Sequence, residues 1–532
     1  MELGEAGHTI WPLQPAPSQR SGKLGSERED TILVPRSTQV AIVAGVLAAT
    51  FLAALDATVV GTALPTIVGE LGGLPLYPWV FSAYLLTSTT TIPLYGRLAD
   101  LYGRKRVLLT ALVVFLLGSA LCGMARSMPQ LVLFRAMQGL GAGGIIPVTL
   151  TILGDLFPIE QRARLQGLTS AVWGTSAVAG PAVGGILTDM LSWRWVFYVN
   201  LPFGLVALGL LGLAFREQIR RQSHQIDYAG ALTLTAGLTL VMLGLLNVGN
   251  GRGWHRELAI GSCVIGSVLL AGFWWYERRA AEPIVPPNLV RQRLMSVVLL
   301  GSVLIGAGMF GTLSYLPLFV QGVLGGTAMS AGAVMMPFAV AWSVASTISG
   351  RVILLFGFRS SVLTGMVAMT IAGLLLQVVP RVHNLATAMT AAGLFGVGMG
   401  FSATAFIIAV QNSVGWGERG IATALVGFAR SIGGAIGVAA LGAVLSTALA
   451  AQHGSVGEGL ADVLLRPEAR AALSSGMLAE LQSMLGDALG FVYLVIFALV
   501  LVAVVLVVWG FPRGELGIRE HEGRMLRKKV DR

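Results

Sequence analysis

Apolar runs long enough to cross a bilayer recur along almost the whole chain, from Val40 to Trp509. Each run has about 20 residues and is bounded by charges, as a transmembrane helix requires. The pattern predicts an all-α polytopic membrane protein with about fourteen transmembrane helices. The predicted spans lie near 40–64, 79–95, 107–125, 130–153, 165–187, 195–215, 228–248, 258–276, 295–320, 330–350, 361–379, 385–414, 421–449 and 491–509.

Basic residues fall mostly on one side of these spans. With a cytoplasmic amino terminus, 27 of the 36 Lys and Arg residues lie on the cytoplasmic side and seven on the other, while Arg135 and Arg430 lie within spans. An excess of Lys and Arg in short loops marks the cytoplasmic side of a membrane protein. We therefore expect a multi-pass protein of the cell (cytoplasmic) membrane with both termini in the cytoplasm and an even number of spans.

Two short Gly/Arg loops suggest that the chain contains two similar halves. One loop begins at Gly96 after the second span, and the other begins at Gly350 after the tenth, with Leu354 standing where Asp100 would be. Chance similarity of two short loops is the alternative. Two six-helix bundles with an inserted central helix pair is the simplest account. The predicted parts are a cytoplasmic tail (1–37), an N-terminal six-helix bundle (38–216), the inserted helix pair (217–277), a cytoplasmic connector (278–294), a C-terminal six-helix bundle (295–511) with an extracytoplasmic loop (450–489), and a second cytoplasmic tail (512–532).

Composition excludes several other classes of protein. Hydrophobic residues make up 55% of the chain and charged residues only 12%, so the net charge of +10 reflects membrane topology. Basic residues are not interleaved with aromatic residues as a nucleic-acid groove would require, and we expect no nucleic-acid partner. The two cysteines support neither a disulfide framework nor a metal site. The spans hold no His/Asp/Glu cluster and the chain has no Walker-type loop, so we expect neither an enzyme nor direct drive by ATP.

One carboxylate interrupts the first apolar run. Keeping Asp56 charged at bilayer depth would be costly, so it must pair, take a proton or face water. Arg135 lies early in the fourth span, which runs toward the cytoplasm, so its depth in the bilayer is similar to that of Asp56. Desolvation favours the neutral carboxyl and a nearby guanidinium favours the charged one, so a separation that changes with conformation could load and release a proton. We predict proton coupling by Asp56 and Arg135; a polar packing residue and a structural snorkelling cation are the alternatives, and Arg430 is taken as structural.

Several motifs together resemble one family of transporters. The loop Gly96–Arg106 is similar to the signature loop of the major facilitator superfamily, and Leu133–Gly139 to its fourth-helix Arg motif. The fifth span is similar to the antiporter motif of its drug/proton exchangers, except that Ser176 stands where Gly is usual. Further segments resemble the fourteen-span drug/proton antiporter branch: 55–65, 314–317 and 418–423.

The resemblance implies a proton-coupled efflux transporter that works by alternating access, with the proton gradient as energy source and no cofactor. It implies that the cargo is amphipathic or lipophilic, drug-like and in some cases cationic. A dedicated exporter of one metabolite, siderophore or lipid is the alternative, and a membrane enzyme or sensor is disfavoured. Its expected partners are small-molecule substrates, protons and the lipid bilayer.

Three groups of residues are the remaining site predictions. We expect a cytoplasmic gate at Gly96, Arg97, Asp100, Gly103 and Arg104. The fifth span contains Gly180, Pro181, Gly184 and Gly185. The proline would kink the helix, and the glycines would allow close packing that seals the route for ion leak; packing alone is the alternative. The cavity would be lined by spans one, two, four and five and their counterparts, with candidates Trp173, Phe310, Tyr315, Met335, Met336, Phe401 and Gln411.

Overall fold

A computed structural model describes residues 36–157, 159–215, 217, 227–248, 256–280, 283–415, 418–453 and 462–512. The described residues are almost entirely helical and include no strand. Nearly all of the two predicted tails lies outside this range, as do parts of the inserted pair, the connector and the loop 450–489.

The apolar runs fold as long helices. The first half contains α1 (Arg36–Leu71), η1 (Leu74–Leu76), α2 (Tyr77–Tyr102), α3 (Arg104–Met124), α4 (Met128–Leu156), α5 (Ile159–Met190), α6 (Trp195–Tyr198) and α7 (Asn200–Ala214). Next come α8 (Tyr228–Val248), α9 (Arg256–Glu277) and the short α10 (Pro287–Val290). The second half contains α11 (Arg293–Leu318), η2 (Phe319–Val323), α12 (Ala328–Val382), α13 (Leu385–Ser413), α14 (Arg419–His453), α16 (Pro467–Ala471) and α17 (Ser475–Gly510).

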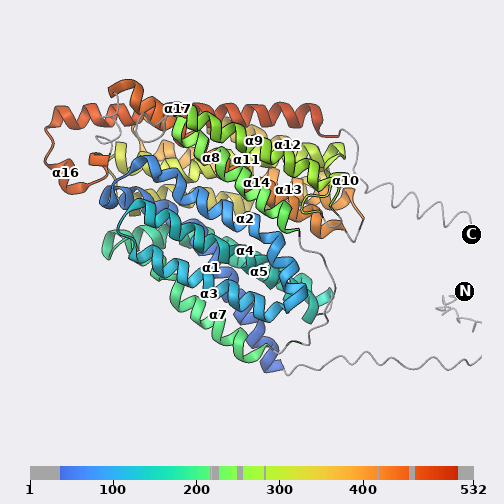
Figure 1. The fold of residues 1–532 in the computed structure, drawn as a ribbon. Helices are drawn as coiled ribbons and strands as arrows, with labels where there is room; N and C mark the ends of the chain where they lie inside the picture. The colour runs from blue at the N-terminus through green and yellow to red at the C-terminus, as the bar shows by residue number, and fades with distance from the viewer. Residues whose placement is uncertain are drawn as a thin grey trace, which may run out of the picture.

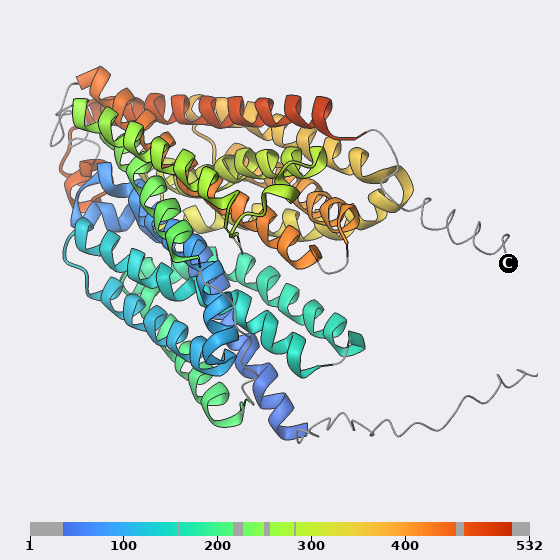
Figure 2. The ribbon, with the colours of Figure 1, turned by 45° about the vertical axis from the view of Figure 1, so that its right-hand side comes forward.

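These helices pack as two bundles with one helix pair beside them (Figure 1). Helices α1 to α7 contact mainly one another, as do α11 to α17, whereas α8 and α9 pack together and α8 also lies against α2 and α14. Figure 2 shows the bundles meeting at the end where α1 finishes and α17 begins, and diverging toward the opposite end. We call the end where the bundles meet the distal end and the end where they diverge the proximal end. The domain boundaries drawn from the sequence stay a prediction.

Twelve helices of the described chain are long and apolar enough to cross a membrane. Helix α2 is not among them, and α12 spans 55 residues, about 80 Å at 1.5 Å per residue and well over one bilayer thickness. Helix α12 contains a break at Gly357, where φ is 82°. The multi-pass all-helical architecture is as expected, and the count of fourteen spans stays a prediction.

The two Gly/Arg loops share one backbone feature. Gly103, the second glycine of the first loop, has φ 94° and ψ 144°, and Gly357, its counterpart, has φ 82° and ψ 168°. Residues with a β-carbon rarely adopt a positive φ, so glycine is needed at both turns. The shared conformation supports the predicted internal repeat.

The segment 462–473, the described start of the long loop before α17, packs against both bundles at the distal end. The Asp462 carboxylate accepts hydrogen bonds from the backbone N–H groups of Gly73 and Leu74, each at 3.1 Å. Arg466 donates to the Gly69 carbonyl, and Leu464 and Leu465 are buried. The segment therefore joins the two bundles by both polar and apolar contacts.

Removal of the Asp462 carboxylate should loosen this distal contact. Hydrogen bonds to a charged acceptor contribute about 1.5–3 kcal/mol, so Asp462→Ala should speed amide hydrogen exchange at Gly73 and Leu74 by about tenfold or more. Glu468→Ala is the matched control, because Glu468 is exposed on α16 in the same segment. Equal exchange rates in both variants would contradict the assignment.

Candidate functional site

Asp56 and Arg135 form an ion pair in the interior of the first bundle. The Arg135 Nη1 atom lies 2.9 Å from the Asp56 Oδ2 atom, and the two side chains are 0% and 1% exposed. Asp56 comes from α1 and Arg135 from α4, so the packing of two membrane helices creates the pair. The structure thus brings together the two residues predicted for proton coupling; that role stays a prediction.

Two buried amides complete the hydrogen bonds of the pair. The Asp56 Oδ1 atom accepts from the Gln138 side-chain amide at 2.8 Å and from the Asn200 amide at 2.9 Å. Gln138 also accepts from Arg135 at 2.7 Å, which follows from their separation of three residues on one face of α4. Asn200, at the start of α7, also donates to Ser119. A buried charge is tolerated when it is both paired and hydrogen-bonded, and this network supplies both conditions.

Aromatic rings hold the Arg135 guanidinium from its other sides. Its central carbon lies 4.1 Å from the centroid of the Tyr84 ring and 5.9 Å from that of Phe197, within the range of cation–π attraction. Its Nε atom donates to the Val80 carbonyl at 3.3 Å. The side chain is therefore fixed in one position between α1, α2 and α4.

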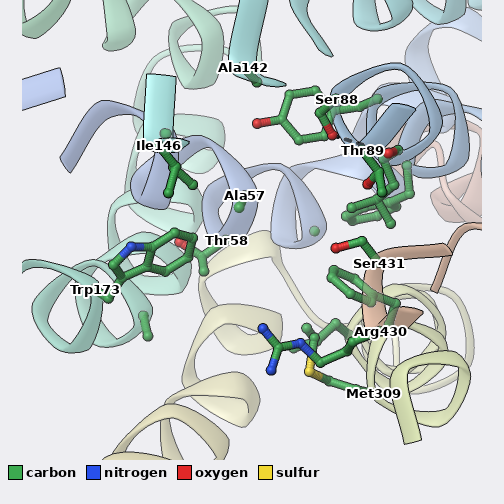
Figure 3. Close-up of a pocket in the computed structure, with 18 of the residues that line it drawn as sticks. Ala57, Thr58, Ser88, Thr89, Ala142, Ile146, Trp173, Met309, Arg430 and Ser431 are labelled. Carbon is green, nitrogen blue, oxygen red and sulfur yellow. Dashed lines mark hydrogen bonds between the residues drawn. The ribbon is translucent and has the colours of Figure 1, made fainter. Parts of the chain in front are cut away.

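A cavity of about 250 Å³ lies between the two bundles and next to this pair. Its wall comes from α1, α2, α4 and α5 on one side and from α11, α12 and α14 on the other. Arg135 is part of the wall, whereas Asp56 is not: its neighbours Ala53 and Ala57 face the cavity and its own carboxylate points into the bundle. Figure 3 shows Trp173, Met309 and Arg430 around this space.

Three of the seven predicted cavity residues line this space: Trp173, Phe310 and Met335. Met336, the residue after Met335 on α12, is not part of this wall. Tyr315 is fully buried in the second bundle, where its hydroxyl donates to the Val438 carbonyl at 2.9 Å.

The two remaining candidates lie on α13, which does not reach the cavity. Phe401 lines a separate shallow groove with Val344 of α12. Gln411 donates to the Thr423 hydroxyl at 3.0 Å and so links α13 to α14. Residue types of the cavity wall could be predicted from the sequence, whereas the rotation of each helix could not.

Several wall and network residues were missed from the sequence. Gln138 stands within the motif 133–139, and Asn200 is a lone amide in an apolar span, so both carried a weak signal. Arg430 was taken as structural and instead lines the cavity. Apolar wall residues such as Phe338 and Trp342 have no sequence signal, because most aromatic residues in membrane helices face lipid or core.

The predicted cytoplasmic gate is held to its own bundle in this structure. Arg104 pairs with Asp100 at 3.3 Å and with Asp155, in the last turn of α4, at 3.0 Å. The Glu217 carboxylate, just after α7, accepts the first backbone N–H groups of α3 from Arg104 at 2.8 Å and Lys105 at 2.9 Å. A carboxylate at a helix N-terminus is favourable because it satisfies otherwise free donors.

Asp100 and Arg97 also face the second bundle. Together with Gly96 they line a cavity of about 340 Å³ at the proximal end, whose far wall includes Leu425 and Phe428 of α14. Gly103 forms the turn with positive φ described above. All five predicted gate residues therefore lie where α2 ends and α3 begins, and Gly96, Arg97 and Asp100 line the space between the bundles.

The glycines of α5 bring it into direct contact with both bundles. A β-carbon at Gly184 would lie 2.6 Å from the Val59 carbonyl oxygen of α1, and one at Gly185 would lie 2.6 Å from the Cα atom of Met329 in α12. Gly180 packs against the Thr58 side chain, and the Pro181 carbonyl lies against Gly332. Small residues allow this close approach of membrane helices.

Replacement of Gly184 by Leu should separate α5 from α1 and reduce transport strongly. The added side chain would occupy space held by α1 backbone, which cannot move aside as a flexible side chain could. We expect a loss of about tenfold or more in transport rate and a lower melting temperature, measured in reconstituted and detergent-solubilised protein. Gly167→Leu on the same helix is the control, because a β-carbon there meets no atom within 4 Å. Equal effects of both substitutions would contradict the packing role.

Comparison with known proteins shows which family this chain is related to. Residues 46–438 match the family described as Major Facilitator Superfamily. The chain is 36% identical over 411 residues to Multidrug transporter protein MdtP of Bacillus subtilis, covering 77% of this chain and 76% of that protein. It is 34% identical over 502 residues to Multidrug resistance protein 3 of the same organism, covering 91% and 98%. It is also 34% identical over 406 residues to Efflux pump FUS6 of Gibberella moniliformis, covering 75% and 72%.

Solved structures share the fold at low sequence identity. A bacterial homolog of the human lysosomal transporter Spinster, in an inward-facing and occupied conformation, superposes with a TM-score of 0.62 at 15% identity, covering 89% of this chain and 97% of that one. Its inward-facing, unoccupied form gives 0.63 at 17% identity, covering 90% and 100%. The family match and the relatives at 34–36% identity show that the chain is a multi-pass membrane transporter rather than an enzyme, and that it belongs to the major facilitator superfamily.

Proposed function

We propose that this transporter exports amphipathic or lipophilic small molecules in exchange for protons. The observation that carries the proposal is the buried Asp56–Arg135 pair, one member of which lines a largely apolar cavity between the bundles. A charged pair excluded from water in a membrane protein is costly to maintain, and such residues commonly serve proton or ion pathways. Multidrug names among the relatives point in the same direction.

Asp56 carries the proton, and the position of Arg135 in the cavity wall depends on whether Asp56 is protonated. Protonation of Asp56 removes the negative charge that holds the guanidinium. The hydrogen bonds that Asp56 accepts from Arg135 and from the side-chain amides of Gln138 and Asn200 then all weaken. Because Asp56 itself does not face the cavity, cargo and proton compete through the position of Arg135 and the packing of α1 against α4.

The distal contacts favour an inward-facing state. Gln321 of η2 donates to the Thr62 carbonyl at 2.7 Å and accepts from Thr66 at 2.8 Å, which joins α1 to the second bundle. The Asp189 carboxylate, at the end of α5, accepts the first backbone N–H groups of α12. With the orientation inferred from the basic residues, these contacts close the outer side while the bundles diverge on the cytoplasmic side (Figure 2). Breaking them would open the outer side.

The wall composition supports a broad apolar cargo. Trp173, Phe338 and Trp342 offer ring faces, and Met309 and Met335 offer flexible apolar side chains. Aromatic and methionine side chains can repack around ligands of different shape. We therefore favour a cargo of several chemically different compounds over a single compound.

Transport by purified protein in liposomes tests this function. With an acidic lumen and the membrane potential clamped, a fluorescent dye should accumulate only while the pH gradient lasts, and a proton ionophore should abolish the accumulation. Several chemically unrelated dyes should each be carried. Dye movement at the same rate without a gradient would reject proton coupling, and transport of a single compound among many would favour the dedicated exporter.

A further inference from the structure

The central cavity has an unbalanced positive charge. Two charged residues, Arg135 and Arg430, appear among its described lining residues, and no Asp or Glu does. Arg135 is neutralised by Asp56 at 2.9 Å. Within the described chain, Arg430 makes no ion pair and its side chain no hydrogen bond. One guanidinium in the wall of the cavity therefore has no counter-ion.

Helix packing directs Arg430 to this place. A β-carbon at Gly306 of α11 would collide with the Arg430 carbonyl, and one at Gly433 would lie 2.5 Å from the Val303 Cα atom. Such close contact between α11 and α14 fixes the rotation of α14 at Arg430. Figure 3 shows the side chain extending from α14 into the space that Trp173 and Met309 border. Backbone contacts thus set which face of α14 carries Arg430, and that face lines the cavity.

The surroundings of Arg430 are apolar and aromatic. Met309, Phe310 and Trp342 line the same cavity, and the Phe338 and Trp342 rings form an edge-to-face pair with centroids 5.6 Å apart. A guanidinium removed from bulk water gains most from a carboxylate, sulfonate or phosphate, because these groups accept two parallel hydrogen bonds. A lipophilic cation would instead meet repulsion. Ser431, the next residue of α14, also lines the cavity and carries a hydroxyl.

We propose that the cavity selects amphipathic anions: molecules with an apolar, preferably aromatic, body and one acidic group that binds Arg430. This inference rests on the proposed function in one respect, namely that the cavity holds the cargo. The proposed cargo is negatively charged, whereas the family resemblance implied a cargo that is cationic in some cases. The anion can come from solution or from an acidic lipid of the bilayer.

Three probes on one scaffold test the charge preference. Pyrenebutanoate, pyrenebutanol and pyrenebutyl-trimethylammonium differ mainly in charge, and the lining residues Trp173 and Trp342 can transfer energy to a bound pyrene. The full chain is placed in nanodiscs of zwitterionic lipid, with empty nanodiscs correcting for partition into lipid. We expect the anion to bind about tenfold or more tightly than the cation, and Arg430→Gln to remove that advantage. Arg430→Lys should restore part of it.

A matched control uses the same helix. Arg419 is exposed at the start of α14, so Arg419→Gln should leave all three affinities unchanged. Phosphatidylglycerol added to the nanodiscs should displace pyrenebutanoate from wild type if a lipid is the natural anion. Displacement indicates a lipid as the natural anion, and no displacement indicates an anion from solution. Both results support an anion site, provided that Arg430→Gln abolishes the anion preference.

Two results would overturn the inference. One is equal binding of anion and cation by the wild type, and the other is an Arg430→Gln variant that weakens all three probes alike. The proposed function fails separately: a loss of gradient dependence for pyrenebutanol transport would reject proton coupling and leave the binding preference intact. Conversely, gradient-driven transport of pyrenebutanol without any charge preference would retain the proposed function and reject the role of Arg430.

Discussion

Replacing Asp56 by Asn should reduce gradient-driven dye accumulation to the level of protein-free liposomes. Asn has nearly the same size, and its Oδ1 atom can still accept from Gln138 and Asn200. Arg135 loses its counter-ion but keeps its hydrogen bond to Gln138 and its contact with the Tyr84 ring, so the bundle should fold with reduced stability. The Asn side chain cannot take up or release a proton, and the state of Arg135 would no longer depend on pH. Dye binding to the cavity should persist, because Asp56 does not line it. Loss of transport with retained binding is the expected signature of a coupling residue.

The matched control for this variant is Asp487→Asn. Asp487 is an exposed carboxylate on α17, and we expect its replacement to leave transport unchanged. The measurement is the initial rate of dye accumulation in liposomes with an imposed pH gradient. Undiminished gradient-dependent accumulation by Asp56→Asn would remove Asp56 from the coupling mechanism.

Removing only the guanidinium should have the largest effect on stability. Arg135→Met leaves the Asp56 carboxylate buried without a counter-ion, and breaking such a pair typically costs about 3–5 kcal/mol. Thermal unfolding of detergent-solubilised protein at neutral pH measures this loss.

The double variant separates charge from packing. Asp56→Asn combined with Arg135→Met removes both charges, so it should recover most of the lost stability while transport stays absent. Arg194→Met is the control, because Arg194 pairs with Glu70 at 2.6 Å but both side chains are substantially exposed. Exposed pairs contribute about 0–1 kcal/mol, so this control should change little. An Arg135→Met protein as stable as the control at neutral pH would contradict the buried pair.

The location of the membrane helices could be predicted well from the sequence, because it depends on local hydrophobicity. Apolar runs located the helices because backbone groups in lipid must be satisfied within a helix. The exception is instructive: α2 carries many Thr and Ser residues and falls short of the hydropathy of a span, yet it lines the cavity. Polarity there reflects its place between the bundles and away from lipid.

Helix rotation limited the site predictions. Asp56 and Arg135 could be matched because each was a rare charge at a similar depth, and charges in an apolar interior must find each other. Tyr315 and Phe401 could not be excluded, since an aromatic residue suits a cavity, a core or a lipid face equally well. Arg430 stood out as a charge, but its lack of a counter-ion depends on which residues surround it in three dimensions.

The sequence by itself determined the membrane class, the family, the buried acid and the loops with special glycines, because these follow from hydropathy, charge and motifs along the chain. The tertiary structure decided that Asp56 points away from the cavity, that Gln138 and Asn200 complete its hydrogen bonds, and that Arg430 lines the cavity with no counter-ion among the described residues. The physical reason is the same in each case. A side chain's partner is set by how helices far apart in sequence rotate and pack, and close glycine contacts fix that rotation.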